Sequence, residues 1–166
     1  MYKRQGLKHA EDEIVSVCGD YTEMSKSDRL RAKESAALFR SGCNCAQSVA
    51  AVYADTCKVS KEQFMKILSF LGRGIAHQQE ICGVVVGALI VMGMWYGSAD
   101  KEDRKEGYQK AERFCNGFRM RYGTLRCREL CQRHSRRVCA AYVAYATILL
   151  EHIQKEKQAN GETIPD

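Results

Sequence analysis

Cysteine is the residue type that gives this sequence its greatest capacity for chemistry. The 166-residue chain contains nine cysteines, at positions 18, 43, 45, 57, 82, 115, 127, 131 and 139. Two of them are one residue apart in the stretch SGCNCAQS at 41–48. The chain is too long for a small disulfide-stapled module and the number of cysteines is odd, so we expect mostly reduced thiols with metal or redox chemistry.

The sequence around Cys45 predicts that this cysteine begins a helix. Asn44 is a favourable N-cap residue, and Gln47 three positions later completes a capping-box pattern. Three further cysteines are predicted to lie near helix starts: Cys82, Cys127 and Cys139. A helix N-terminus carries partial positive charge, which favours thiolate over thiol. We therefore expect lowered pKa values, which suit metal ligands and attacking thiols.

The remaining cysteines have plainer interpretations. Cys115 lies on an apolar helix face, and Cys18 and Cys57 resemble it, so these three are expected to fill space in the core. Cys43 is interpreted as incidental or auxiliary to its neighbour Cys45. Cys131 follows Cys127 by four residues and shares its predicted helix face, so it is either a spare ligand or a resolving thiol.

The elements that must position these thiols are predicted to be helices. Apolar residues recur at helical spacing, and the one proline is Pro165. The segments predicted to be helical are approximately 25–40, 45–55, 61–71, 79–96, 100–122, 124–131 and 135–157. We expect an all-α, single-domain bundle of six to seven helices over 25–158, with an N-terminal arm at 1–24 and a flexible tail at 159–166.

The segment ICGVVVGALIVMGMWY at 81–96 carries no charge. It is shorter than the roughly 20 residues of a membrane-spanning helix, so a buried, glycine-containing central helix is predicted. Gly83 and Gly87 are four residues apart, which leaves a flat groove for close approach. The groove suits tight helix packing, and it would also suit a cofactor or facing thiols.

Two further helices are predicted to contribute to the core. The segment 100–122 carries one apolar stripe: Tyr108, Ala111, Cys115, Phe118 and Tyr122. The segment 135–157 is apolar on two faces, so it should be central. The apolar and aromatic helix faces also suggest a homodimer.

Arginine is concentrated in one part of this chain, whose net charge is +6. Eight arginines and one acidic residue lie between positions 113 and 137. Such a segment could bind anions or nucleic acid, although a solvated face with local ion pairs is the expected interpretation. Four arginines flank Cys127 and Cys139 and are expected to lower the pKa values of these thiols: Arg126, Arg128, Arg136 and Arg137.

The N-terminal stretch is basic but has no apolar core of signal-peptide length, so a cytoplasmic protein without a membrane segment is expected. His77 and His134 are the histidines nearest the cysteine elements, and a solvated role is expected for them. The sequence contains no phosphate-binding loop, dinucleotide fingerprint or Ser-His-Asp pattern, and it leaves enzymatic turnover open.

Four separated elements resemble the small C-GCAxxG-C-C proteins, a family described as redox-active. The elements are SGCNCAQSV, EICGVVVGALIVMGMWYG, RYGTLRCREL and RRVCAAYVAYA, and the resemblance spans about residues 30–150. The residues that match the family's motifs are Gly42, Asn44, Cys45 and Gln47 in the first element, Cys82, Gly83 and Gly87 in the second, and the later cysteines Cys127 and Cys139. Val84 stands where the family has alanine, and Cys43 stands where an aromatic residue is common.

The resemblance implies a redox-active set of Cys45, Cys82, Cys127 and Cys139. These thiols would cycle between dithiol and disulfide with an unknown redox partner. The alternative is that the same four thiols hold zinc or an iron–sulfur cluster. Some relatives are haem proteins of the split-Soret cytochrome type, but covalent c-type haem is not expected because the chain has no CxxCH.

Overall fold

The computed structural model describes residues 25–133 and 138–159. The predicted arm at 1–24, with Cys18, lies outside the described residues, as do residues 134–137 and 160–166. The described residues form seven α-helices and one 3₁₀ helix, which confirms the all-α prediction. The helices are α2 (Lys26–Arg40), α3 (Cys45–Ala50), η2 (Ala51–Tyr53), α4 (Lys61–Ile67), α5 (Gly83–Tyr96), α6 (Arg104–Tyr122), α7 (Cys127–Arg133) and α8 (Cys139–Ala159).

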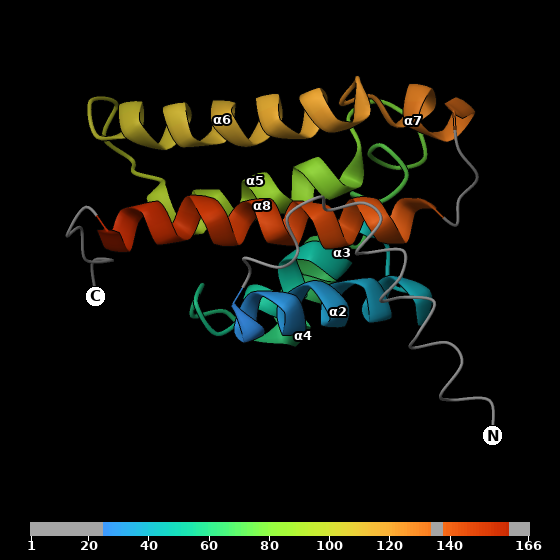
Figure 1. The fold of residues 1–166 in the computed structure, drawn as a ribbon, viewed down its shortest axis with the longest axis horizontal. Helices are drawn as coiled ribbons and strands as arrows, with labels where there is room; N and C mark the ends of the chain where they lie inside the picture. The colour runs from blue at the N-terminus through green and yellow to red at the C-terminus, as the bar shows by residue number, and fades with distance from the viewer. Residues whose placement is uncertain (1–24, 134–137, 160–166) are drawn as a thin grey trace.

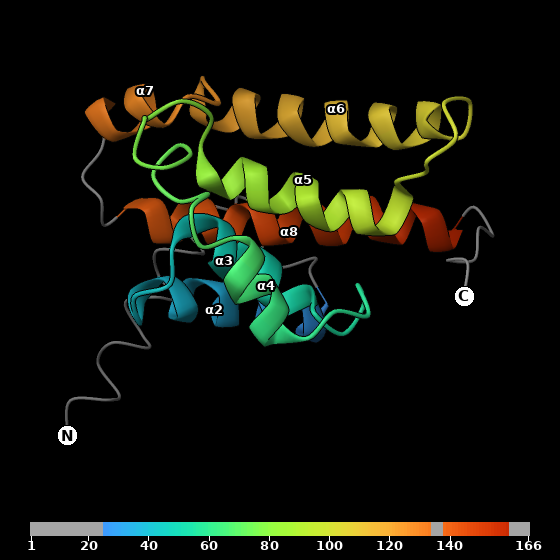
Figure 2. The same ribbon diagram turned by 180° about the vertical axis from the view of Figure 1, so that it is seen from behind.

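The helices are stacked in three layers (Figures 1 and 2). The middle layer consists of α5 and α8, with α6 and α7 on one side and α2, α3 and α4 on the other. The central helix α8 contacts α2, α3, α5 and α6, and α5 contacts α3, α6 and α8. Both helices predicted to be central are therefore central.

Three helix starts are fixed by the side chains that the sequence predicted. Ser25, Asn44 and Ser60 each cap a helix and accept a hydrogen bond from a backbone N–H three residues on. In each case the side chain of that third residue accepts a hydrogen bond from the N–H of the cap. These capping boxes satisfy backbone N–H groups that a helix start leaves without intrahelical partners.

The buried face of α6 overlaps the predicted stripe but is shifted from it, since Ala111, Cys115 and Tyr122 are only partly buried against the core. Tyr108 is 71% exposed, whereas Phe114 and Phe118 are buried and Lys110 is 8% exposed. The Lys110 ammonium lies 2.7 Å from a Glu106 carboxylate oxygen and 5.2 Å from the centre of the Tyr96 ring. The long aliphatic part of Lys110 is thus buried while its charge is paired.

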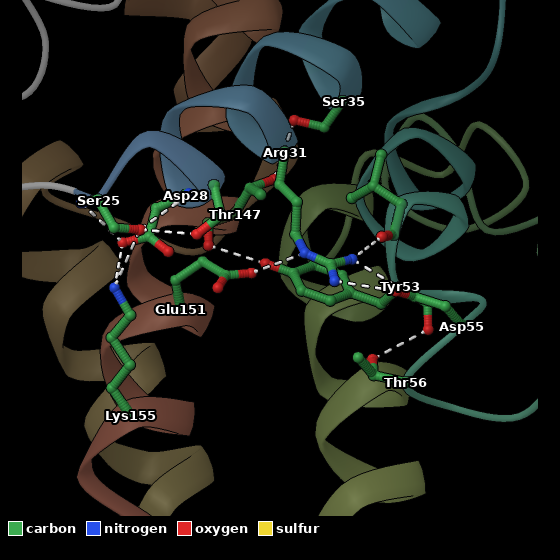
Figure 3. A network of polar contacts seen from close by, with 12 residues as sticks. Ser25, Asp28, Arg31, Ser35, Tyr53, Asp55, Thr56, Thr147, Glu151 and Lys155 are labelled. Atoms are coloured by element: carbon green, nitrogen blue, oxygen red, sulfur yellow. Dashed lines mark hydrogen bonds and ion pairs between the residues drawn. The ribbon is translucent and has the colours of Figure 1, made fainter. Parts of the chain in front are cut away.

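A polar network joins α2 to α8 and to the turn after η2 (Figure 3). The Arg31 guanidinium donates to both carboxylate oxygens of Asp55, at 3.1 and 3.0 Å, and its Nε lies 3.4 Å from Glu151 Oε1. Lys155 donates to Asp28, which is buried in the first turn of α2. These paired charges fix the first helix onto the last.

None of the described helices, α5 included, combines the length and apolar character that a membrane span requires.

Candidate functional site

All four predicted site cysteines stand at the start of a helix. Cys45 is the first residue of α3, Cys127 of α7 and Cys139 of α8, and Cys82 is the N-cap of α5. These helices come from different parts of the chain, and their starts lie at the same end of the bundle (Figure 2). The fold therefore brings together thiols that are far apart in sequence.

The side chains flanking Cys45 clamp the start of α3 to the end of α4. Asn44 caps α3, and its amide also donates to the carbonyl oxygens of Leu68 and Ser69, at 2.9 and 3.1 Å. Gln47 completes the capping box and donates to the Met65 carbonyl oxygen at 2.7 Å. Two of the polar residues in the first family element therefore hold the backbone that presents Cys45.

The glycines of α5 allow this helix to lie directly against α3. A Cβ atom on Gly83 would stand 2.6 Å from the Leu71 carbonyl oxygen and 3.2 Å from Cβ of Cys45. On Gly87 it would stand 2.6 Å from the carbonyl oxygen of Ala46. Of the uses predicted for these glycines, close helix packing is the one seen, and it places Cys45 beside the start of α5.

An antiparallel backbone pairing brings Cys82 next to Cys127. The Cys82 N–H donates to the Leu125 carbonyl oxygen at 2.8 Å, and the Cys127 N–H donates to the Glu80 carbonyl oxygen at 2.6 Å. Ile81 and Arg126 form the β-bridge between these bonds. Because this pairing occupies 79–82, α5 begins at Gly83 and not at Gln79 as the sequence predicted.

The thiols surround a cavity of about 590 Å³. Five of the described cysteines line it: Cys43, Cys45, Cys127, Cys131 and Cys139. Cys82 is 4% exposed and lies within electrostatic range of Cys45, Cys127 and Cys139. A cavity of this size is large enough for a small molecule.

The predicted lowering of thiol pKa values is wrong for Cys82 and Cys127. Burial raises the pKa of Cys82 far above its usual value, and neighbouring thiols raise it further. Burial also raises the pKa of Cys127 to about 12, with a further contribution from Cys131. Desolvation disfavours the charged thiolate more strongly than the start of a helix favours it.

Among the described residues, the positive charge that opposes this effect at Cys127 comes from Arg73 and not from the predicted neighbours Arg126 and Arg128. Arg126 and Arg128 are exposed, and Arg136 and Arg137 lie outside the described residues. Arg73 lines the cavity and lies 3.5 Å, Nη1 to Nδ1, from His77, which lines it too. The sequence predicted only a helix at 61–71, just before Arg73, and no role for this arginine.

The segment that carries Arg73 and His77 has a left-handed backbone. The φ angles of residues 73–77 all lie between 48° and 70°. For residues other than glycine this conformation costs about 1–2 kcal/mol each. Hydrogen bonds from Gln79 N–H to the Arg73 carbonyl oxygen and from Glu80 N–H to the Gly74 carbonyl oxygen, both 3.1 Å, hold the segment against the cavity.

Within the described parts of the chain, no three His, Cys, Asp or Glu side chains are arranged to hold a metal ion. The predicted alternative of a four-thiolate metal centre therefore finds no preformed ligand group there. The predicted anion or nucleic-acid site in the arginine-rich segment remains a prediction, since part of that segment lies outside the described residues.

Two described cysteines lie away from the cavity. Cys57 is buried in the core, where desolvation raises its pKa to about 11. Cys115 is half-buried on α6, and burial raises its pKa as well. Both positions agree with the space-filling role predicted for these residues.

Fold and site together define an all-helical protein with cysteines gathered at several helix starts around one cavity. The chain belongs to the C-GCAxxG-C-C family, because the family's sequence model, described as "Putative redox-active protein (C_GCAxxG_C_C)", matches residues 43–153. Val84, where this chain departs from the family alanine, is fully buried. Searches of the curated proteins and of the solved structures found no match to the chain.

Proposed function

We propose that this protein is a dithiol–disulfide redox protein whose working thiols are Cys45, Cys82, Cys127 and Cys139. The observation that carries the proposal is the position of Cys82, which lies within electrostatic range of the other three. Three of the four thiols also line one cavity, where a reaction partner has room to bind. The membership in a family described as redox-active supports the same chemistry.

The proposed reaction is thiol–disulfide exchange. Two protein thiols lose two protons and two electrons as one disulfide forms between them. A disulfide substrate takes up those electrons and protons, its S–S bond breaks, and two thiols leave. Attack requires a thiolate, so each attacking thiol must first give its proton to solvent or to a base.

The burial of the thiols supports a direction for this exchange. A couple is a strong oxidant when its reduced form is stabilised, as low-pKa thiolates are. Here burial raises the pKa values of Cys82 and Cys127, so the reduced form is not stabilised as thiolate. We therefore propose that the protein donates electrons to disulfides and is regenerated by a dithiol reductant.

The test begins with protein purified without oxygen, analysed for metals and for reduced thiols. Mild oxidation should then remove thiols in pairs, and peptide mapping should find the resulting disulfides within the four-cysteine set. Serine variants of the four should each change this pattern. Cys57→Ser and Cys115→Ser are the matched controls, because both residues lie away from the cavity.

Two results would contradict the proposal. Stoichiometric zinc or iron, with four thiols protected from alkylation, would establish the metal-centre alternative instead. Oxidation that is slow, unselective and equal in wild type and in all variants would leave the cysteines as core residues.

A further inference from the structure

Cys131 differs from every other described cysteine in its surroundings. It is exposed, whereas the others are buried or half-buried. Its Sγ atom lies 3.8 Å from Sγ of Cys127, which is 7% exposed. Both thiols line the cavity, so the pair extends from solvent to the proposed redox set.

The position of Cys131 follows from helix geometry. Residues four apart lie on the same face of a helix, with Cβ atoms about 5–6 Å apart. Cys127 and Cys131 are so spaced on α7. Cys45, which is 9% exposed, lines the same cavity and acts electrostatically on Cys127. One exposed thiol and two buried thiols thus line the same cavity.

We infer that Cys131 is the thiol that attacks an external, low-molecular-weight disulfide and passes the oxidation to Cys127. The inference rests on the proposed function, and it adds a catalytic residue that the family resemblance does not include. The substrate class follows from the cavity, whose volume of about 590 Å³ suits a small molecule.

The exchange proceeds in two balanced steps. The Cys131 thiolate attacks one sulfur of R–S–S–R, whose S–S bond breaks, and RS⁻ leaves and takes up a proton. Cys127 then loses its proton and attacks Sγ of Cys131. The second RS⁻ leaves and is protonated, and a Cys127–Cys131 disulfide remains. Two protein thiols have been oxidised, and one external disulfide has been reduced to two thiols.

The new disulfide is expected to be short-lived. Disulfides prefer Cβ atoms about 3.5–4.5 Å apart, closer than helix spacing provides, and a strained bridge is more easily reduced. Cys45 can then attack Sγ of Cys127, which releases the Cys131 thiolate to be protonated and leaves a Cys45–Cys127 disulfide. Cys131 thus returns to its thiol form while the oxidation moves to the interior.

The test compares two oxidants. Oxidised glutathione is the small disulfide substrate, and diamide is a thiol oxidant that is not itself a disulfide. Cys127→Ser removes the second step, so it should accumulate glutathione on Cys131, found by mass analysis of its peptide. Cys131→Ser should react with oxidised glutathione at least tenfold more slowly than wild type, yet still form disulfides within the four-cysteine set when treated with diamide. Circular dichroism checks that each variant is folded.

Two controls sharpen the result. Cys115→Ser should react with oxidised glutathione at the wild-type rate, because Cys115 does not line the cavity. Cys57→Ser should do so as well, because Cys57 is buried in the core and does not line the cavity.

The inference about Cys131 and the proposed function fail in distinguishable ways. A wild-type rate in Cys131→Ser, or glutathione trapped on Cys43, would overturn the role of Cys131 while diamide-induced disulfides still supported the redox set. If neither oxidant produced a disulfide within the set in wild type, the proposed function would fall and the inference about Cys131 with it.

Discussion

Gly87 of α5 lies so close to Ala46 of α3 that a Cβ atom on the glycine would stand 2.6 Å from the Ala46 carbonyl oxygen and 2.8 Å from its Cα atom. Backbone atoms cannot rotate out of the way as a flexible side chain can. We therefore expect Gly87→Ala to push α3 away from α5 and to lower the free energy of unfolding by about 1–3 kcal/mol. Urea unfolding measures this loss.

Gly93 is the matched control for this substitution. It lies on the same helix, but a Cβ atom there would meet nothing within 4 Å. Gly93→Ala should leave the free energy of unfolding unchanged or raise it by up to about 1 kcal/mol, since alanine favours helix. Equal losses in the two variants would show that helix contact is not the reason for Gly87.

Asn44 has two structural roles that substitutions can separate. Asn44→Ala removes both the cap of α3 and the hydrogen bonds to Leu68 and Ser69. Asn44→Ser keeps a capping oxygen but no donor that reaches α4. We expect the alanine variant to lose about 1–2 kcal/mol or more, and the serine variant to lose less, in thermal or urea unfolding. A serine variant as unstable as the alanine variant would show that the cap contributes little.

The reactivity of Cys127 should increase steeply with pH. Burial raises its pKa to about 12, so at neutral pH the thiolate is a very small fraction. The rate of alkylation by iodoacetamide, followed on the Cys127 peptide, should rise about tenfold per pH unit through pH 7–10. A rate that levels off near pH 8 would contradict the raised pKa.

Arg73 should set part of that reactivity. Its charge lowers the pKa of Cys127 against the effect of burial, so Arg73→Gln should slow alkylation of Cys127 severalfold at pH 9. Arg126→Gln is the matched control, because Arg126 precedes Cys127 in sequence but is exposed. If Arg126→Gln slowed alkylation of Cys127 as much as Arg73→Gln does, Arg73 would not be the arginine that sets the pKa of Cys127.

Glu151 should make stability depend on pH. Its pKa is raised by burial, against the opposing charge of Arg31, so the folded protein holds this proton more tightly than the unfolded chain does. The contribution of Glu151 to stability is complete below its unfolded pKa of about 4.5 and is lost as pH rises through the folded value.

Glu151→Gln removes that titration while keeping the shape of the side chain. The melting temperature of the variant, relative to wild type, should therefore rise between pH 4 and pH 7. Asp28 interacts directly with Glu151, but its own pKa is lowered with Lys155 donating to it, so in wild type Asp28 stays ionised over this pH range. A constant difference across this range would refute the raised pKa of Glu151.

Local signals in the sequence were sufficient for much of the fold. Capping residues fixed three helix starts because a cap acts on N–H groups only a few residues away. The uncharged stretch at 81–96 identified a central helix because such a surface is stable only when buried. The resemblance also directed attention to four cysteines that the fold brings to one end of the bundle.

The predictions that were wrong concern features that depend on contacts between residues far apart in the sequence. The start of α5 was predicted four residues too early, because 79–82 pair with a segment more than forty residues later. The buried face of α6 was predicted only in part, because burial of Lys110 depends on Glu106 and Tyr96. The pKa values of Cys82 and Cys127 were predicted in the wrong direction because helix position can be read locally, whereas desolvation depends on the whole surrounding fold.

Three cysteines of the thiol site are synthesised before the helix that completes the bundle. Cys45, Cys82 and Cys127 leave the ribosome before Cys139 and the helix α8 that it begins. Because α8 contacts α2, α3, α5 and α6, the three-layer bundle is incomplete until this helix is made. Long-range contacts of this kind form late in folding. We expect the earlier cysteines to remain open to stray oxidants until then, so that the last helix both completes the bundle and shields its sulfur chemistry.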